Sequence, residues 1–137
     1  MREFIRHPTT IPVEYNILGL ATNTLEHDQM NNISEGGLCF QTERNIDLTS
    51  RVRIKISITK PIFEAIGVVA WCQSVDGHYD IGIQFTDTQT EFKIRMVEQI
   101  CHIEEYREHV QKKEGRKLSG EEAAREWIEK YAGDFPR

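Results

Sequence analysis

Two arginines near the start of the sequence have the residue type and the spacing to bind an anionic ligand. Arg2 and Arg6 form an R-x-x-x-R pattern immediately before the first expected strand. A guanidinium group is planar and donates paired hydrogen bonds, so each arginine can hold a phosphate group or the acceptor edge of a base. Because this spacing also arises by chance, the pair alone predicts no more than a local cationic site.

A second polar pattern follows about a strand pair later in the chain. Residues 32–37 have the sequence N-I-S-E-G-G, which fits the form N-x-S-x-x-G. Ser34 can donate or accept a hydrogen bond, and Gly37 lets a backbone approach closely or adopts a positive φ. The alternative is an ordinary turn that uses serine and glycine for backbone reasons. The presence of Arg2 and Arg6 makes that alternative less favourable.

Residues that could support catalysis or bind a metal lack the necessary spacing. The five histidines form no H-x-x-x-H pair, and no cysteine lies near one at the spacing of a zinc site. Acidic residues occur mainly on the expected helices beside lysines and arginines, which indicates a solvated helix face. The sequence contains neither a P-loop nor a G-x-G-x-x-G motif. We therefore expect a binding protein that is not an enzyme and has no metal or cofactor.

Length and composition indicate one small domain. At 137 residues the chain can bury a hydrophobic core, and its formal charge of -5 counts against binding to duplex nucleic acid. The three cysteines have no C-x-x-C spacing and are expected to be buried thiols in a reducing compartment. No apolar run is long enough for a membrane span, and the first residues do not resemble a signal peptide. We expect a cytoplasmic protein.

Alternating apolar residues predict a series of β-strands between residues 9 and 85. The clearest is 51–58, in which every second residue is valine or isoleucine. Other segments with this period are 11–17, 38–42, 61–73 and 79–85, with a weaker candidate at 20–30. Asp76-Gly77 suits a tight hairpin turn. About six short antiparallel strands predict a small closed barrel, because closure removes exposed sheet edges.

Two helices are expected after the barrel. Thr88-x-x-Glu91 and Ser119-x-x-Glu122 both have the form of a capping box, and the second helix should end near Gly133. The first helix carries an apolar stripe that we expect to cover one end of the barrel, formed by Phe92, Met96, Ile100, Ile103 and Val110. We assign 1–112 to a barrel domain with its capping helix, and 113–137 to a linker and a short helix. The predicted fold class is mainly β: a small six-stranded antiparallel barrel, followed by one long and one short α-helix.

Together these patterns resemble the PilZ family, whose signature is R-x-x-x-R followed by [D/N]-x-S-x-x-G in a six-stranded barrel. Residues 67–71 (G-V-V-A-W) and 79–85 (Y-D-I-G-I-Q-F) are similar to the family's later G-x-V-x-W and Y-x-x-G-I-x-F strands. The resemblance covers residues 2–85 and a helix after the barrel. It implies a PilZ-like β-barrel that binds the bacterial second messenger cyclic di-GMP (c-di-GMP).

The resemblance also implies the ligand-binding residues. Cyclic di-GMP has two guanines and two ring phosphates, which Arg2 and Arg6 would meet with paired hydrogen bonds. Each such contact to a base edge contributes about 1–3 kcal/mol of discrimination. Asn32 would accept from a guanine edge, and a neutral acceptor forms a bond weaker by a factor of about two than a carboxylate does. Ser34 and Gly37 complete the implied site.

Two features of the implied site have more than one interpretation. Trp71 is either a platform on which a base stacks, or a residue that packs in the core. Some family members carry an arginine at the position of Met1 and bind a stacked pair of ligands, so a single ligand is slightly favoured here. Because Arg2 lies near the start of the sequence, we expect residues 1–7 to be mobile until ligand orders them, at about 1–2 kcal/mol per residue.

The leading hypothesis is a c-di-GMP effector, in which ordering of residues 2–7 alters a surface that a downstream protein partner binds. The first alternative is a PilZ-like adaptor that binds protein without nucleotide. The second is a small barrel that binds single-stranded nucleic acid, for which Arg51, Arg53 and Lys55 offer a basic stripe. The acidic overall charge and the order of the motifs favour the effector.

Overall fold

The computed structural model describes residues 6–19, 26–59, 62–86 and 90–131, without the side chains of residues 90–92. These residues form seven strands and two helices: β1 (His7–Pro8), β2 (Pro12–Ile17), β3 (Glu26–Ile33), β4 (Gly37–Thr42), β5 (Arg51–Ile56), β6 (Phe63–Val75), β7 (His78–Phe85), α1 (Thr90–Glu114) and α2 (Gly120–Tyr131). The predicted fold class is confirmed, and the short strand β1 is added to it. Neither described helix has the length and apolar character that a membrane span needs.

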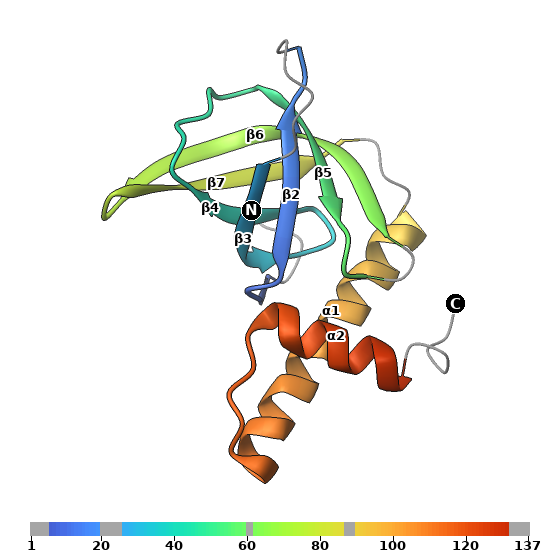
Figure 1. Cartoon of the computed structure of the whole chain (residues 1–137). Coiled ribbons are helices and arrows are strands. Elements are labelled where there is room, and N and C mark those ends of the chain that lie inside the picture. Colours follow the sequence, from blue (N-terminus) through green and yellow to red (C-terminus); the bar gives the residue numbers. More distant parts are fainter. Residues whose placement is uncertain (1–5, 20–25, 60–61, 87–89, 132–137) are drawn as a thin grey trace.

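Six of these strands form a closed antiparallel barrel (Figure 1). They pair in the order β3-β2-β5-β6-β7-β4, and pairing between β3 and β4 closes the ring. β1 adds to β3 beyond the end of β2, with His7 opposite Ile33 and Pro8 opposite Asn32. β1 therefore lies beside the end of β3 that leads into the N-x-S-x-x-G segment.

Alternating side chains build the core of the barrel. In β5, Val52 and Ile54 are fully buried, whereas Arg51 before them and Arg53 between them are exposed. The largest fully buried side chains are Tyr15, Phe40, Phe63, Ile11, Met30, Ile33, Leu38, Ile46, Ile54, Ile56, Ile81 and Ile100. Most of them come from strands and Ile100 comes from α1, so the barrel and the helix share one core.

β3 is the strand that the sequence pattern predicted least well. Residues 20–25 of the expected segment lie outside the described residues, and the strand continues to Ile33. The alternation of apolar and polar residues is interrupted in this strand, because inward-facing Met30 and Ile33 are separated by two asparagines. The predicted turn between β6 and β7 is confirmed: Asp76 and Gly77 have φ values of 44° and 88°, as a tight hairpin requires.

The two helices have the faces expected from the sequence. In α1 the predicted residues Met96, Ile100, Ile103 and Val110 are all buried. The capping box of α2 is confirmed, since Glu122 N donates to Ser119 Oγ at 3.0 Å and Ser119 N donates to Glu122 Oε1 at 2.9 Å. The expected capping box of α1 and the side chain of Phe92 lie outside the described residues, as does Gly133.

Both helices pack at one end of the barrel (Figure 1). The hydroxyl of Thr9 donates to Glu104 Oε2 of α1 at 2.7 Å. At the start of α2, Gly120 is buried against the chain between β1 and β2. A Cβ atom there would lie 2.6 Å from Thr10 Oγ1 and 2.9 Å from Ile11 N. The first turn of α2 therefore contacts backbone of the barrel directly.

This contact predicts that Gly120→Ala lowers the free energy of unfolding by about 1–3 kcal/mol, because the added methyl group overlaps the barrel backbone. Chemical denaturation followed by circular dichroism measures the change. Glu129→Ala, at an exposed position of the same helix, should alter stability by less than about 0.5 kcal/mol. Equal stability of the Gly120→Ala variant and the unaltered protein would show that α2 does not dock on this segment.

Candidate functional site

The two halves of the predicted signature meet at the end of β3. Arg6 Nη1 donates a hydrogen bond of 3.0 Å to Asn32 Oδ1. The strand β1, which begins one residue after Arg6, positions this contact because Pro8 pairs with Asn32 across the sheet. Arg2, the other arginine of the predicted pair, lies outside the described residues.

A β-bulge in β3 turns Asn32 toward solvent. On the β4 side, Met30 pairs with Phe40 and Asn32 pairs with Cys39, so Asn31 is an extra residue. Without an extra residue, strict alternation after inward-facing Met30 would direct Asn32 into the core. The bulge places both asparagines on the outer face and returns Ile33 to the core.

Side-chain hydrogen bonds hold this bulge in place. Asn31 Nδ2 donates to Asp80 Oδ1 at 3.1 Å and lies 3.4 Å from Cys39 Sγ. Its Oδ1 accepts from Gln41 Nε2 at 2.9 Å. One asparagine side chain thus links β3 to both β4 and β7, which fixes the strand geometry on which the orientation of Asn32 depends.

A second bulge, in β6, turns Trp71 toward solvent. In β6, Val69 pairs with Ile83 and Trp71 pairs with Gly82, so Ala70 is the extra residue. Trp71 consequently points outward, and its half-buried indole lies across Gly82, where a Cβ atom would overlap the ring. Trp71 is therefore outside the barrel core, and the close approach explains why residue 82 is glycine.

The two bulges produce a continuous outer-face row of four residues: Asn32, Cys39, Gly82 and Trp71. They come from β3, β4, β7 and β6 in turn, and paired residues in a sheet project to the same side. Three strand spacings make the row about 14 Å long. Small side chains lie in its middle, with Arg6 and Asn32 at one end and an indole at the other.

Ser34 and Gly37 have structural roles beside the row. Ser34 Oγ accepts from Gly36 N at 3.1 Å and donates to Gly37 O at 3.3 Å, which stabilises the turn between β3 and β4. Gly37 serves close packing, because a Cβ atom there would overlap the carbonyl oxygen of Ile83 in β7. The ordinary turn weighed from the sequence is thus present, and a ligand contact by either residue stays a prediction.

The charges around the row are unevenly distributed. Cys39 is 3% exposed, and this burial is the main cause that raises the pKa of its thiol. The Asp80 carboxylate acts in the same direction, while the hydrogen bond from Asn31 and the positive charge of Arg6 oppose it. The middle of the row is therefore a neutral thiol that lies between a guanidinium group and a carboxylate.

Sequence patterns missed three residues of this site: Asn31, Cys39 and Asp80. Asn31 was visible as the first of two consecutive asparagines, but the pairing that makes it a bulge involves another strand. Asp80 lies within the segment that resembles the family, at a position its pattern leaves open. Taken together, the site offers a cation, amide acceptors, a carboxylate and an aromatic surface, which suit binding of a planar, anionic ligand.

The structure is thus a closed antiparallel barrel that carries polar and aromatic groups on one outer face. The model of the PilZ domain family matches residues 1–101, and the chain belongs to this family. The resemblance drawn from the four sequence segments is thereby confirmed.

Solved structures with the same fold include complexes with c-di-GMP. The PilZ domain of YcgR from Escherichia coli with c-di-GMP has a TM-score of 0.60 and 14% identity, over 84% of this chain and 98% of that chain. The K. pneumonia MrkH complex with c-di-GMP has a TM-score of 0.61 and 10% identity, over 77% and 54% of the two chains. The inhibitor of motility MotI/DgrA from Bacillus subtilis has a TM-score of 0.56 and 13% identity, over 67% of this chain and 45% of that chain.

The chain spans about half the length of MrkH and of MotI/DgrA. At these identities the structural similarities support the fold alone. No curated protein matches the chain in sequence.

The packing of Trp71 on Gly82 predicts that Gly82→Ala displaces the indole, at a cost of about 1–3 kcal/mol in stability. In a ¹H–¹⁵N NMR spectrum, the indole N–H signal of Trp71 should move and exchange faster with water. The indole signal of Trp127, which is buried in α2, serves as the internal reference. Gln84→Ala, at an exposed position two residues along β7, is the matched control; an unmoved Trp71 signal in Gly82→Ala would contradict the described packing.

Proposed function

We propose that this protein is a c-di-GMP receptor that acts as an effector and changes its contacts with a partner protein when ligand binds. The observation that carries the proposal is the hydrogen bond between Arg6 and Asn32, which joins both halves of the family signature at one end of the outer-face row. The fold that the chain shares with the c-di-GMP complexes of YcgR and MrkH adds support.

The groups along the row match the parts of c-di-GMP. Arg6, with Arg2 as the second arginine of the signature, can hold a ring phosphate or the O6 and N7 edge of guanine. The indole of Trp71 offers a stacking surface, and stacking contributes about 1–3 kcal/mol per base. Cys39 is 3% exposed and the indole covers Gly82, so the ligand would lie over the indole and the Arg6 side chain rather than against the sheet itself.

Asn32 has a role that depends on whether ligand is bound. In the described structure its carbonyl oxygen accepts from Arg6. When the Arg6 guanidinium turns to the ligand, that oxygen is released and can accept from a guanine N–H. Ser34 and Gly37 shape the turn between β3 and β4 that follows Asn32, so they would contribute to the site through this turn.

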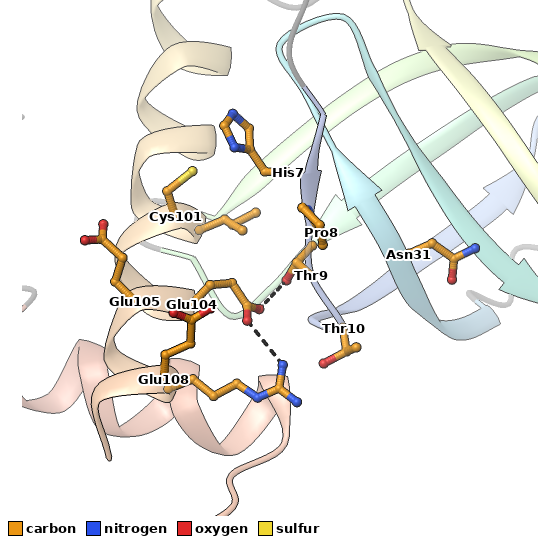
Figure 2. A pocket seen from close by; sticks show the side chains of 11 residues that line it. His7, Pro8, Thr9, Thr10, Asn31, Cys101, Glu104, Glu105 and Glu108 are labelled. Carbon is orange, nitrogen blue, oxygen red and sulfur yellow. Dashed lines mark hydrogen bonds and ion pairs between the residues drawn. The ribbon is translucent and has the colours of Figure 1, made fainter. Parts of the chain in front are cut away.

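The strand β1 connects this site to α1. Arg6 precedes β1 directly, and Thr9 follows it and donates to Glu104 Oε2. Arg107 Nη1 donates to the other oxygen of the same carboxylate at 3.2 Å. Figure 2 shows this junction in the lining of a groove of about 490 Å³ between β1 and α1. A movement of Arg6 toward the ligand displaces β1, and the groove is the surface through which a partner protein would detect it.

Single-stranded nucleic acid is a less suitable ligand, because acidic residues interrupt the basic stripe of β5. In the strand register, Lys55 lies opposite Glu14 of β2 on one side and opposite Glu64 of β6 on the other. Negative charges therefore flank the basic stripe at Lys55. Nucleic-acid binding depends on a continuous positive surface, which this face of the barrel lacks.

Isothermal titration of c-di-GMP into the untagged protein tests the proposed function. We expect saturable binding near micromolar affinity, about -8 kcal/mol. Arg6→Ala should weaken binding by about tenfold or more, because a paired hydrogen bond to a base contributes about 1–3 kcal/mol.

Arg53→Ala is the matched control. It removes the same charge from an exposed position on β5, which lies across the barrel from β4, and should leave the affinity unchanged. Absence of binding at high ligand concentration would contradict the receptor function and favour the adaptor, which binds protein without nucleotide. Equal weakening by both substitutions would indicate that binding depends on overall charge alone.

The connection through β1 makes a separate prediction for amide hydrogen exchange. Ligand should slow exchange in residues 3–7 and change it in α1 around Glu104. Thr9→Val removes the hydroxyl donor, so it should abolish the response in α1 while c-di-GMP still binds. Equal exchange in residues 3–7 with and without ligand would exclude this route of signal transfer.

A further inference from the structure

A carboxylate lies beside the outer-face row, where a base stacked on Trp71 would place one of its edges. Asp80 of β7 pairs with Gln41 of β4 and with Gln73 of β6, which places it one outward position along β7 from Gly82. Asp80 and Trp71 are therefore diagonal neighbours on adjacent strands, about 7–8 Å apart. A purine base spans this distance.

The contacts of Asp80 leave one carboxylate oxygen available. Asn31 Nδ2 donates to Oδ1 at 3.1 Å, and His78 Nε2 lies 3.3 Å from the same oxygen. Within the described part of the chain, both contacts thus use Oδ1. The side chain is 23% exposed, so Oδ2 can accept from a ligand while the contacts to Oδ1 hold the carboxylate in position.

Guanine is the base whose edge best fits a carboxylate at this place. Its N1–H and its exocyclic N2 amine are adjacent donors, and a carboxylate accepts both with hydrogen bonds about twice as strong as those to a neutral acceptor. Asn32, which the family signature assigns to this task, is neutral, so the bond that it can form with guanine after Arg6 releases its oxygen is the weaker one. The site therefore has a charged acceptor at Asp80 and none at Asn32.

On the basis of the proposed function, we propose that Asp80 is the residue that selects guanine in this site. Its carboxylate accepts hydrogen bonds from the N1–H and N2–H groups of a base stacked on Trp71. The placement also separates the charges of the ligand. Asp80 is on β7 and Asn32 is on β3, two strand spacings or about 10 Å away, so phosphates held at Arg6 are kept apart from the carboxylate.

Two ligands that differ in one amine test this assignment. Cyclic di-IMP carries hypoxanthine in place of guanine: it lacks the N2 amine but keeps N1–H, O6, N7 and both phosphates. By isothermal titration, the unaltered protein should bind c-di-GMP about tenfold or more tightly than cyclic di-IMP. In Asp80→Asn the ratio of the two affinities should fall toward one, mainly because c-di-GMP binds more weakly.

Asp76→Asn is the matched control, because it removes the same charge from the exposed β6–β7 turn and should keep the full preference. Continued binding of cyclic di-IMP by Asp80→Asn shows that the site is still folded. Retention of the preference in Asp80→Asn, or an equal loss of both ligands, would overturn the assignment of Asp80 while leaving the receptor function intact. Absence of binding of either ligand to the unaltered protein would overturn both.

Discussion

In a closed barrel, side chains alternate between the core and solvent, so consecutive residues reach the same face only where an extra residue interrupts the pairing. The candidate site depends on two such interruptions. Asn31 turns Asn32 outward in β3, and Ala70 turns Trp71 outward in β6. With regular pairing, Asn32 would be directed into the apolar core, and Arg6 would have no partner on the outer face.

The same geometry links the site to the rest of the molecule. The bulge at Asn31 is held by side chains of β4 and β7, and β1 pairs with β3 immediately after it. At the far end of β1, Thr9 bonds to α1, and the adjoining Thr10–Ile11 backbone contacts the start of α2. In the proposed function, ligand contact at Arg6 would therefore act on a short strand whose following residues contact both helices, and this would connect one side of the barrel to its helical end.

Most of the fold could be predicted from local patterns, because strand alternation, the capping box of α2 and the Asp76-Gly77 turn each depend on residues that are neighbours in the sequence. The bulges at Asn31 and Ala70 could not be predicted in this way, because each is defined by pairing with a strand that is distant in the sequence. Trp71 is an example. Its place at the end of a strand was compatible with core packing or with ligand stacking, and the extra residue Ala70 directs its side chain to the outer face. Asp80 was missed for a related reason, because its neighbours Asn31 and Trp71 are close in space and distant in sequence. The contribution to ligand binding stays a prediction for all six residues assigned from the sequence: Arg2, Arg6, Asn32, Ser34, Gly37 and Trp71.

NMR mapping of bound c-di-GMP would show whether the ligand binds on the outer-face row. On titration into ¹⁵N-labelled protein, signals of Asn32, Cys39, Gly82 and the Trp71 indole should shift most, and guanine protons should show nuclear Overhauser effects to the indole. Signals of β2 and β5, on the far side of the barrel, should change little. Shifts centred on β2 and β5, or saturating binding that leaves the four row residues unperturbed, would show that the ligand binds elsewhere.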